Sequence, residues 1–320
     1  GDVYKRQACD STICHGTSAR NDRLTSRSTT MPSRTRTQHR CIVEGHGTPN
    51  LGPFFSSMDY FEDALFTVFA HHQPARGDPG TRSVFADEAL APSRHGERRI
   101  VYRIPELSSE NTRLFAHHQW DAGVHLAKMI TTREMDVRAK RVVELGAGTS
   151  LPSLVAAVMG ARHCVVTDYP DPDILAALQR NVHDTCDAYV ALSLEVRGLA
   201  WGDVSQEAQA GGPFDMVMAA DVLWVSSQHA HLLHSICALL AHTSEARAVI
   251  VAGFHTGRPA TARFFEAARE AGLVPDATAK FGGMYERSVL GDERAYTASD
   301  DMGDIEERSK WVVVACLRWR

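Results

Sequence analysis

The sequence predicts an α/β fold with a mostly parallel sheet, and three observations support that prediction. From residue 140 onward, short apolar runs alternate with longer amphipathic segments. A Gly-Ala-Gly loop at 146–148 follows the first of these runs directly. The second run ends in an acid, Asp168, which lies 22 residues after Gly146. Alternating strands and helices form right-handed crossovers, and open sheets of this kind bind ligands at the carboxyl ends of their strands.

Length and composition are those of a globular protein. The 320 residues, 44% hydrophobic and 23% charged, suffice for one large domain with extensions. A net charge of -5 argues against a nucleic-acid binder, which usually carries a basic excess. We expect no membrane span, because no run of about 18 apolar residues is present. The seven cysteines form no C-x-x-C pair, which favours reduced thiols and a cytoplasmic location.

Three regions are predicted along the chain. Residues 1–50 form a disordered basic head, since residues 1–40 carry eight Lys or Arg against three acids and few apolar residues. The composition of this head also resembles a transit peptide, and we assign it no function. Residues 51–135 form an extension packed on the core, with helices at 58–69 and 120–131 around a hairpin at 84–90 and 99–104. Residues 136–320 form the main domain.

Within the main domain, each element follows from a run of apolar residues. Strands are expected at 141–145, 163–167, 190–197, 214–220, 247–254 and 311–318. Helices are expected between them at 151–160, 172–183, 228–241 and 260–271. The last strand follows a charged loop without a convincing helix, so it should pair antiparallel. A mostly parallel seven-stranded sheet with one antiparallel strand is typical of Rossmann-like methyltransferases rather than dehydrogenases.

The first strand-to-helix loop indicates a nucleoside site. Gly146 and Gly148 permit a sharp turn and close approach of a ligand, with Ser150 as a candidate N-cap. A dinucleotide fingerprint needs a third glycine at position 151, where this chain has Leu151. A carboxylate at Glu144 suits the ammonium of a methionine moiety better than a pyrophosphate. The loop therefore favours S-adenosylmethionine over NAD.

Three positions after later strands suit the same cofactor, and a fourth suits the substrate. Asp168 can accept the ribose hydroxyls, and the glycines upstream favour this role over the alternative that it caps the Pro-rich turn that follows. Trp201 can lie against the adenine ring, or it can be a core residue at the edge of a loop. Ala220 leaves room for the cofactor, and we expect Asp221 to face the arriving substrate nitrogen.

These residues resemble the seven-strand lysine methyltransferase family, over about residues 80–320. The most similar group is fungal and nicotinamide N-methyltransferase-like, and it includes the N-terminal and lysine methyltransferase of translation elongation factor one-alpha. The segments that carry the resemblance are Leu114–Gly123, Val143–Pro152, Thr167–Asp173, Ala200–Gly202 and Ala220–Trp224. The stretch Asp-Tyr-Pro-Asp at 168–171 is the most specific of them.

The resemblance implies a set of site residues. Cofactor contacts fall on Phe115, Trp120, Glu144, Gly146, Ala147, Gly148, Asp168, Tyr169, Trp201 and Ala220. The family's acidic D-x-x-aromatic motif falls on Asp221 and Trp224. The family usually carries Trp at the position of Phe115, a small polar residue at that of Ala220, and Tyr or Phe at that of Trp224. His255–Pro259 would form a further wall of the cleft.

The predicted activity is S-adenosylmethionine-dependent N-methylation of a lysine or N-terminal amine of a protein, with a translation factor as a candidate acceptor. Methyl transfer needs a neutral nitrogen aimed at the methyl group, so we expect Asp221 and Trp224 to position that nitrogen. A nicotinamide-type enzyme acting on small amines, a dehydrogenase, and a non-catalytic cofactor-binding module remain as alternatives. We expect a monomer. We also expect no metal site, because His229, His231 and His234 do not share one helical face.

Overall fold

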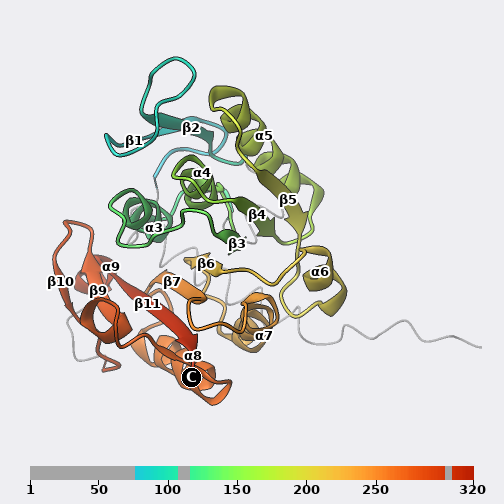
Figure 1. Cartoon of the computed structure of the whole chain (residues 1–320). Coiled ribbons are helices and arrows are strands. Elements are labelled where there is room, and N and C mark those ends of the chain that lie inside the picture. Colours follow the sequence, from blue (N-terminus) through green and yellow to red (C-terminus); the bar gives the residue numbers. More distant parts are fainter. Residues whose placement is uncertain (1–75, 107–115, 300–304) are drawn as a thin grey trace, which may run out of the picture. The chain divides into compact units, whose positions relative to one another are not determined.

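The computed structural model describes residues 76–106, 116–299 and 305–320. The expected head at 1–50 and the expected helix at 58–69 lie outside these ranges. The described chain has three layers, with helices on both faces of a central sheet (Figure 1). One face carries α3 (Asp121–Thr131), α4 (Leu151–Val158) and α5 (Pro172–Ala188), and the other carries α6 (Val204–Gln209), α7 (His229–Leu239) and α8 (Arg258–Glu270).

Five parallel strands form the centre of the sheet. Their order is β7-β6-β3-β4-β5, and their bounds are β3 (Arg141–Leu145), β4 (His163–Asp168), β5 (Leu194–Gly198), β6 (Met216–Ala220) and β7 (Arg247–Gly253). The last strand, β11 (Trp311–Trp319), pairs antiparallel with β7, and β9 (Met284–Ser288) pairs antiparallel with β11. Of these seven strands only β11 runs against the others, which confirms the predicted mostly parallel arrangement, although two further short strands bring the sheet to nine.

The strands that the sequence did not predict are short or polar. β8 (Leu273–Pro275) and β10 (Glu293–Ala295) pair with β11 and β9, and three residues are too few to show periodicity. β9 was missed because Glu286 and Arg287 lie at its centre, although both side chains are buried. The short helices α6, η1 (Ser226–Gln228), η2 (Lys280–Gly283) and α9 (Ile305–Ser309) were also not predicted.

Two boundaries in the main domain differ from the expected ones. α5 continues to Ala188, five residues past its predicted end, and β5 begins at Leu194 rather than at 190. The intervening turn contains Ala191 with φ 58°, a left-handed conformation that neither a helix nor a strand accommodates. The remaining predicted strands and helices of the main domain are confirmed to within two residues at each end.

Alternate strand residues supply the two cores. Val142 of β3 packs in the cluster that includes α3 and α4, whereas Val143 packs in the cluster that includes α7 and α8. This follows from the two-residue repeat of a strand, whose successive side chains point to opposite faces. Because both faces are covered, the central strands are apolar nearly throughout. The carboxyl ends of the parallel strands, with the loops that follow them, therefore carry the polar residues.

The N-terminal elements belong to the first of these cores. β1 (Arg82–Ala86) and β2 (Arg99–Arg103) form the expected hairpin, in which Phe85 pairs with Ile100, but β1 ends four residues before the predicted end at 90. Both of these side chains are buried together with residues of α3 and α4. Asn181 of α5 fixes the hairpin, because its amide accepts from Arg103 N at 2.8 Å and donates to Arg103 O at 3.0 Å.

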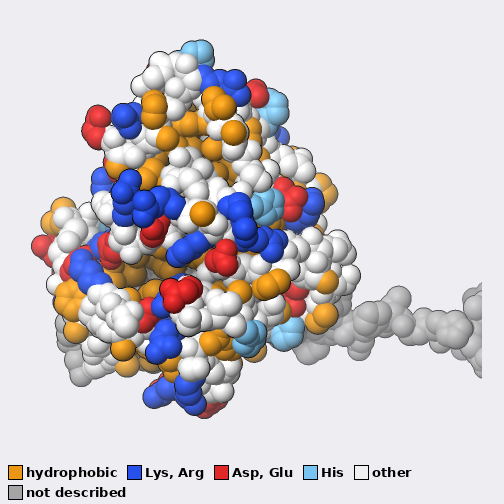
Figure 2. Space-filling view, viewed as in Figure 1, with side chains coloured by type: hydrophobic (Ala, Val, Ile, Leu, Met, Phe, Trp, Pro, Cys, Tyr) orange, Lys and Arg blue, Asp and Glu red, His pale blue; other side chains and the backbone are white. Residues whose placement is uncertain are grey.

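The surface carries charges of both signs. On the face drawn in Figure 2, Lys and Arg side chains are interspersed with Asp, Glu and apolar side chains, in a chain whose net charge is -5. Among the described residues, no helix combines the length and the apolar character needed to cross a bilayer.

Candidate active site

The loop between β3 and α4 is shaped by its two glycines. Gly146 and Gly148 have φ of 69° and 53°, which favour glycine. A Cβ at Gly146 would lie 2.9 Å from Val222 Cγ1 and 3.2 Å from Trp201 Cζ2, so no side chain fits there. A Cβ at Gly148 would have no atom of a described residue within 4 Å, so this part of the loop faces open space. Ala147 N donates to Thr167 O at 3.0 Å, which ties the loop to β4.

The start of α4 differs from the expected capping. Ser150 stands at the N-cap position, but its hydroxyl is buried and makes no hydrogen bond with a described residue, so the predicted cap is wrong. Its φ of 68° turns the backbone into the helix without a side-chain cap. Glu144 satisfies the helix end instead, because its Oε2 accepts from Ser153 N at 3.0 Å and from Ser153 Oγ.

Glu144 is almost fully buried beneath α4. Burial raises the pKa of its carboxyl to about 8, although the bonds from Ser153 favour the charged form. The carboxyl is therefore committed to the helix terminus on at least one oxygen. Its predicted role as a ligand of the methionine ammonium stays a prediction.

Asp168 joins the end of β4 to the glycine loop. Its Oδ2 accepts from Gly148 N at 2.8 Å and its Oδ1 accepts from Tyr169 N at 2.7 Å. Burial raises the pKa of this carboxyl, and the two backbone N–H groups oppose that rise. A carboxylate offers about four lone-pair positions, so each oxygen can still accept one ribose hydroxyl. The side chain of Tyr169 is exposed.

Trp201 lies across the glycine loop. Its indole ring lies close to the Cα of Gly146, where it leaves no room for a Cβ, and the side chain is half-buried. The next residue, Gly202, donates its N–H to Ser235 Oγ at 2.8 Å, and Ser235 donates to the buried Glu207 at 2.6 Å. These bonds fix the turn that presents Trp201 beside the loop, where the adenine was expected.

The segment before α3 contacts both the glycine loop and His255. Gln119 Oε1 accepts a hydrogen bond from Thr149 in the glycine loop. The Trp120 ring meets the His255 ring edge-on, with 5.6 Å between the centroids. His118 is 5.4 Å from the Trp120 ring, and burial lowers the pKa of its imidazole to about 4. The predicted contact at Phe115 lies outside the described residues.

Asp221 directly follows β6 in a strained backbone conformation. Its φ of 60° is left-handed, and its N–H donates to Val251 O at 2.7 Å. Its Oδ1 accepts from Gly253 N at 2.9 Å and lies 2.7 Å from His255 Nε2. A buried non-glycine residue in this region costs about 1–3 kcal/mol and persists where the surroundings impose it. Ala220 before it and Trp224 after it are both half-buried.

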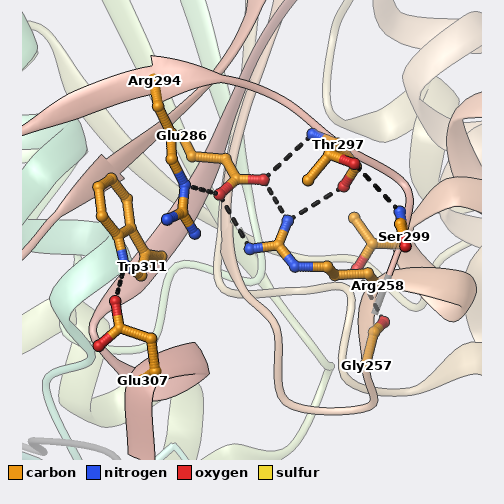
Figure 3. Close-up of polar contacts among 9 residues, drawn as sticks. Gly257, Arg258, Glu286, Arg294, Thr297, Ser299, Glu307 and Trp311 are labelled. Carbon is orange, nitrogen blue, oxygen red and sulfur yellow. Dashed lines mark hydrogen bonds and ion pairs between the residues drawn. The ribbon is translucent and has the colours of Figure 1, made fainter. Parts of the chain in front are cut away.

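The loop after β7 is held by buried charges that the sequence did not reveal. Arg258 makes a bidentate ion pair with Glu286 of β9, and Arg294 donates to the same carboxylate at 2.7 Å (Figure 3). Burial acts to raise the pKa of Glu286, but the hydrogen bonds from its two arginines leave that pKa below its usual value. Arg294 in turn lies 3.7 Å from the Trp311 ring centroid.

The contacts above bring most of the predicted site residues to one edge of the sheet. Gly146, Gly148, Asp168 and Trp201 meet around the glycine loop, whereas Asp221 and Trp120 meet at His255. His255 was predicted only as part of a wall, and its pairing with Asp221 was missed because the two residues are 34 positions apart. The signal in the sequence is an acid directly after one strand and a histidine two residues after the next.

The first of these groups fits a nucleoside cofactor. The loop faces open space at Gly148, and the Asp168 carboxylate beside it retains acceptor capacity. A comparison with known protein families matches the lysine methyltransferase model to residues 105–271. The chain belongs to the lysine methyltransferase family. It is accordingly an S-adenosylmethionine-dependent methyltransferase.

Relatives and solved structures extend the comparison. The chain is 35% identical over 171 residues to the protein N-terminal and lysine N-methyltransferase EFM7 of Candida glabrata, covering 51% of this chain and 65% of that protein. It is 34% identical over 219 residues to the protein of the same name from Schizosaccharomyces pombe, covering 65% and 82%. A putative methyltransferase solved with SAH has 12% identity and a TM-score of 0.42, with 82% and 66% covered.

Replacing Glu286 should test the buried ion pair. In Glu286→Gln the Arg258 guanidinium loses its charged partner, and we expect the free energy of unfolding to fall by about 3–5 kcal/mol. Urea unfolding followed by circular dichroism measures this. The matched variant Glu97→Gln breaks the exposed pair with Arg99 and should cost less than about 1 kcal/mol. Equal losses in the two variants would contradict the assignment.

The raised pKa of Glu144 predicts a pH dependence of stability. Its folded pKa of about 8 exceeds the unfolded value, so its stabilising contribution is full in acid and is lost as pH rises through 8. Urea unfolding between pH 5.5 and 8.5 should show a decline that Glu144→Gln flattens. Glu245→Gln on the exposed surface should leave the decline unchanged. A wild-type curve already as flat as that of Glu144→Gln would refute the assignment.

Substitution at Gly148 should separate strain from cofactor binding. Gly148 and Gly96 both have positive φ and open space at the Cβ position, so alanine should destabilise both variants similarly, by about 1 kcal/mol. Only Gly148→Ala places a methyl group where the cofactor is expected. We expect its Kd for S-adenosylhomocysteine, measured by calorimetry, to rise at least about tenfold. An unchanged Kd would remove the loop from the cofactor site.

Proposed function

We propose that this protein transfers methyl groups to the N-terminal amine and to lysine side chains of a protein. The observation that supports this most directly is the buried Asp221 carboxylate, which is held on a left-handed backbone next to Val222, a residue that packs against Gly146 of the glycine loop. The names of the relatives from Candida glabrata and Schizosaccharomyces pombe support the same acceptor class. A translation factor as acceptor, a cytoplasmic location and a monomeric state stay predictions.

In this proposal, one group of residues binds S-adenosylmethionine and another binds the acceptor amine. Bound S-adenosylmethionine supplies an electrophilic methyl group on a sulfonium. The glycine loop and Asp168 orient the nucleoside, and Trp201 covers the loop. Among the described residues, both hydrogen-bonding partners of the Asp221 carboxylate use Oδ1. Its Oδ2 is therefore the oxygen that accepts a hydrogen bond from the acceptor amine, and the ring of Trp224 receives the cationic side chain.

Asp221 favours transfer by orientation. A lysine or N-terminal amine must lose a proton to solvent before its lone pair can attack, and a carboxylate that holds one N–H aims that lone pair. The left-handed backbone at Asp221 fixes where this carboxylate lies relative to the glycine loop. Asparagine also tolerates this conformation, so Asp221→Asn removes the charge without a new backbone constraint.

The acceptor class and the role of Asp221 can be tested together. Purified protein is incubated with labelled S-adenosylmethionine and a fungal lysate, and label is traced into protein and into small molecules. We expect label in protein, and a fall of about 10- to 100-fold in Asp221→Asn from the loss of a charge-assisted hydrogen bond. Calorimetry should show unchanged affinity for S-adenosylhomocysteine.

The same substitution at the other end of β6 provides the control. Asp215 accepts from Arg141 N at 2.8 Å at the amino edge of the sheet, so Asp215→Asn should keep full activity. Full turnover in Asp221→Asn with intact cofactor binding would disprove the role of Asp221. Label confined to small molecules would favour an enzyme acting on small amines, and binding without any transfer would favour a non-catalytic module.

A further inference from the structure

We propose that His255 is a positioning residue that aims the Asp221 carboxylate at the acceptor amine, and that the Arg258–Glu286 pair holds His255 in place. The proposal rests on the proposed function, because it specifies how the acceptor half of that site is assembled. His255 Nε2 lies 2.7 Å from Asp221 Oδ1, and both side chains are buried. Since a carboxylate only accepts hydrogen bonds, Nε2 is the nitrogen that donates.

The donor from His255 selects which oxygen faces the substrate. Gly253 N and His255 Nε2 both point at Oδ1 of Asp221. Two donors on one oxygen fix the rotation of the carboxylate about its last side-chain bond. With the backbone donor alone, the carboxylate could swing and exchange its oxygens. The hydrogen bond from His255 therefore keeps Oδ1 of Asp221 facing the protein and leaves Oδ2 to face the acceptor amine.

The place of the imidazole is determined by a glycine on one side and a tryptophan on the other. A Cβ at Gly253 would lie 2.8 Å from His255 Nε2, so the ring lies directly against the Cα of that residue. The Trp120 ring packs edge-on against His255, with an interplanar angle of 76°. Gly253 does not have a positive φ, and the three atoms nearest to such a Cβ all belong to the imidazole.

Buried ionic contacts hold the backbone on the far side of His255. The Arg258 guanidinium lies 4.0 Å from the ring centroid of the buried Phe254, and Gly257 N donates to Phe254 O at 3.1 Å. The same guanidinium is clamped by Glu286, and its Nη1 donates to Thr297 O at 3.0 Å (Figure 3). The four residues from 254 to 257 are thus fixed at both ends, with His255 between them.

This arrangement predicts that loss of His255 slows transfer without weakening cofactor binding. Of the residues expected to contact the cofactor, Gly146, Gly148 and Asp168 do not bond to His255, whose Nε2 lies against Asp221. Trp120 contacts His255 through ring packing, which a phenylalanine at position 255 retains. A misplacement of about 1 Å in an orienting group can cost about 100-fold in rate. Loss of His255 should therefore lower the maximal rate of methyl transfer to the acceptor.

Four variants separate the hydrogen bond from packing. His255→Phe keeps a ring against Trp120 but removes the donor, whereas His255→Gln places a carboxamide N–H near the position of Nε2. Gly253→Ala leaves both Asp221 and His255 in the sequence but displaces the imidazole. His242→Phe is the matched control, because His242 is exposed and stacks on Trp319 at 4.0 Å between ring centroids.

The measurement is label transfer from S-adenosylmethionine into fungal lysate, with the lysate titrated to give a maximal rate and a half-saturating concentration. We expect His255→Phe and Gly253→Ala to lower the maximal rate at least about tenfold, and His255→Gln to retain it within about threefold. Kd for S-adenosylhomocysteine should stay within about twofold in all variants. His242→Phe should match the wild type.

Two outcomes would overturn the positioning role. One is a wild-type rate in His255→Phe, and the other is a His255→Gln rate no better than that of His255→Phe. If the phenylalanine variant does not fold, Gly253→Ala decides the same question, and a wild-type rate there would overturn the proposal. Failure of the proposed function looks different, because the wild type would then label small molecules instead of protein.

Discussion

Buried carboxylates along the carboxyl edge of the sheet can remain there only if the chain supplies their hydrogen bonds. An ionised carboxylate without partners is far too costly to bury. Glu144 is satisfied by the first turn of α4, Asp168 by the glycine loop, and Asp221 by the end of β7. Each of these bonds joins a strand end to a different segment of the chain. The same contacts that make the acids tolerable therefore fix the loops that form the site.

The three acids differ in how much capacity they leave for a ligand. Glu144 is committed to a helix end and has a raised pKa, which suits a structural group. Asp168 has one backbone donor on each oxygen, so both oxygens stay half-used and can accept a pair of hydroxyls. Asp221 has both of its donors on one oxygen, so the other oxygen is left for a single amine. The positions of the donors therefore suit a ligand with two hydroxyl groups at Asp168 and a ligand with a single amine at Asp221.

The sequence predicted the central fold because that part of the chain is apolar and regular. The runs that became β3, β4, β6 and β7 alternate with amphipathic helices, and local pattern alone is enough to place them. β9 was missed for the opposite reason, since Glu286 and Arg287 are buried by ionic partners from distant segments. A local pattern cannot show that a charged residue is neutralised by a partner 28 positions away.

The same distinction explains which site residues were found. Gly146, Gly148 and Asp168 are recognisable because a tight loop and an acid after adjacent strands have a fixed spacing. The capping role assigned to Ser150 failed because a residue type was considered without its conformation, which is left-handed here. The Asp221–His255 pair depends on β6 and β7 being neighbours in the sheet, which spacing along the chain does not determine.

The Arg258–Glu286 pair is better explained by its orientation of the loop at 254–257 than by a contribution to the stability of the fold. A buried ion pair repays its desolvation cost only in part, and apolar residues of similar volume often stabilise a protein as well. Such residues could not, however, hold the loop at a defined angle through directed bonds. The guanidinium meets a carboxylate, a backbone carbonyl and an aromatic face at once. This geometry allows one arrangement of residues 254–257, and an acceptor site that works by orientation requires a single arrangement.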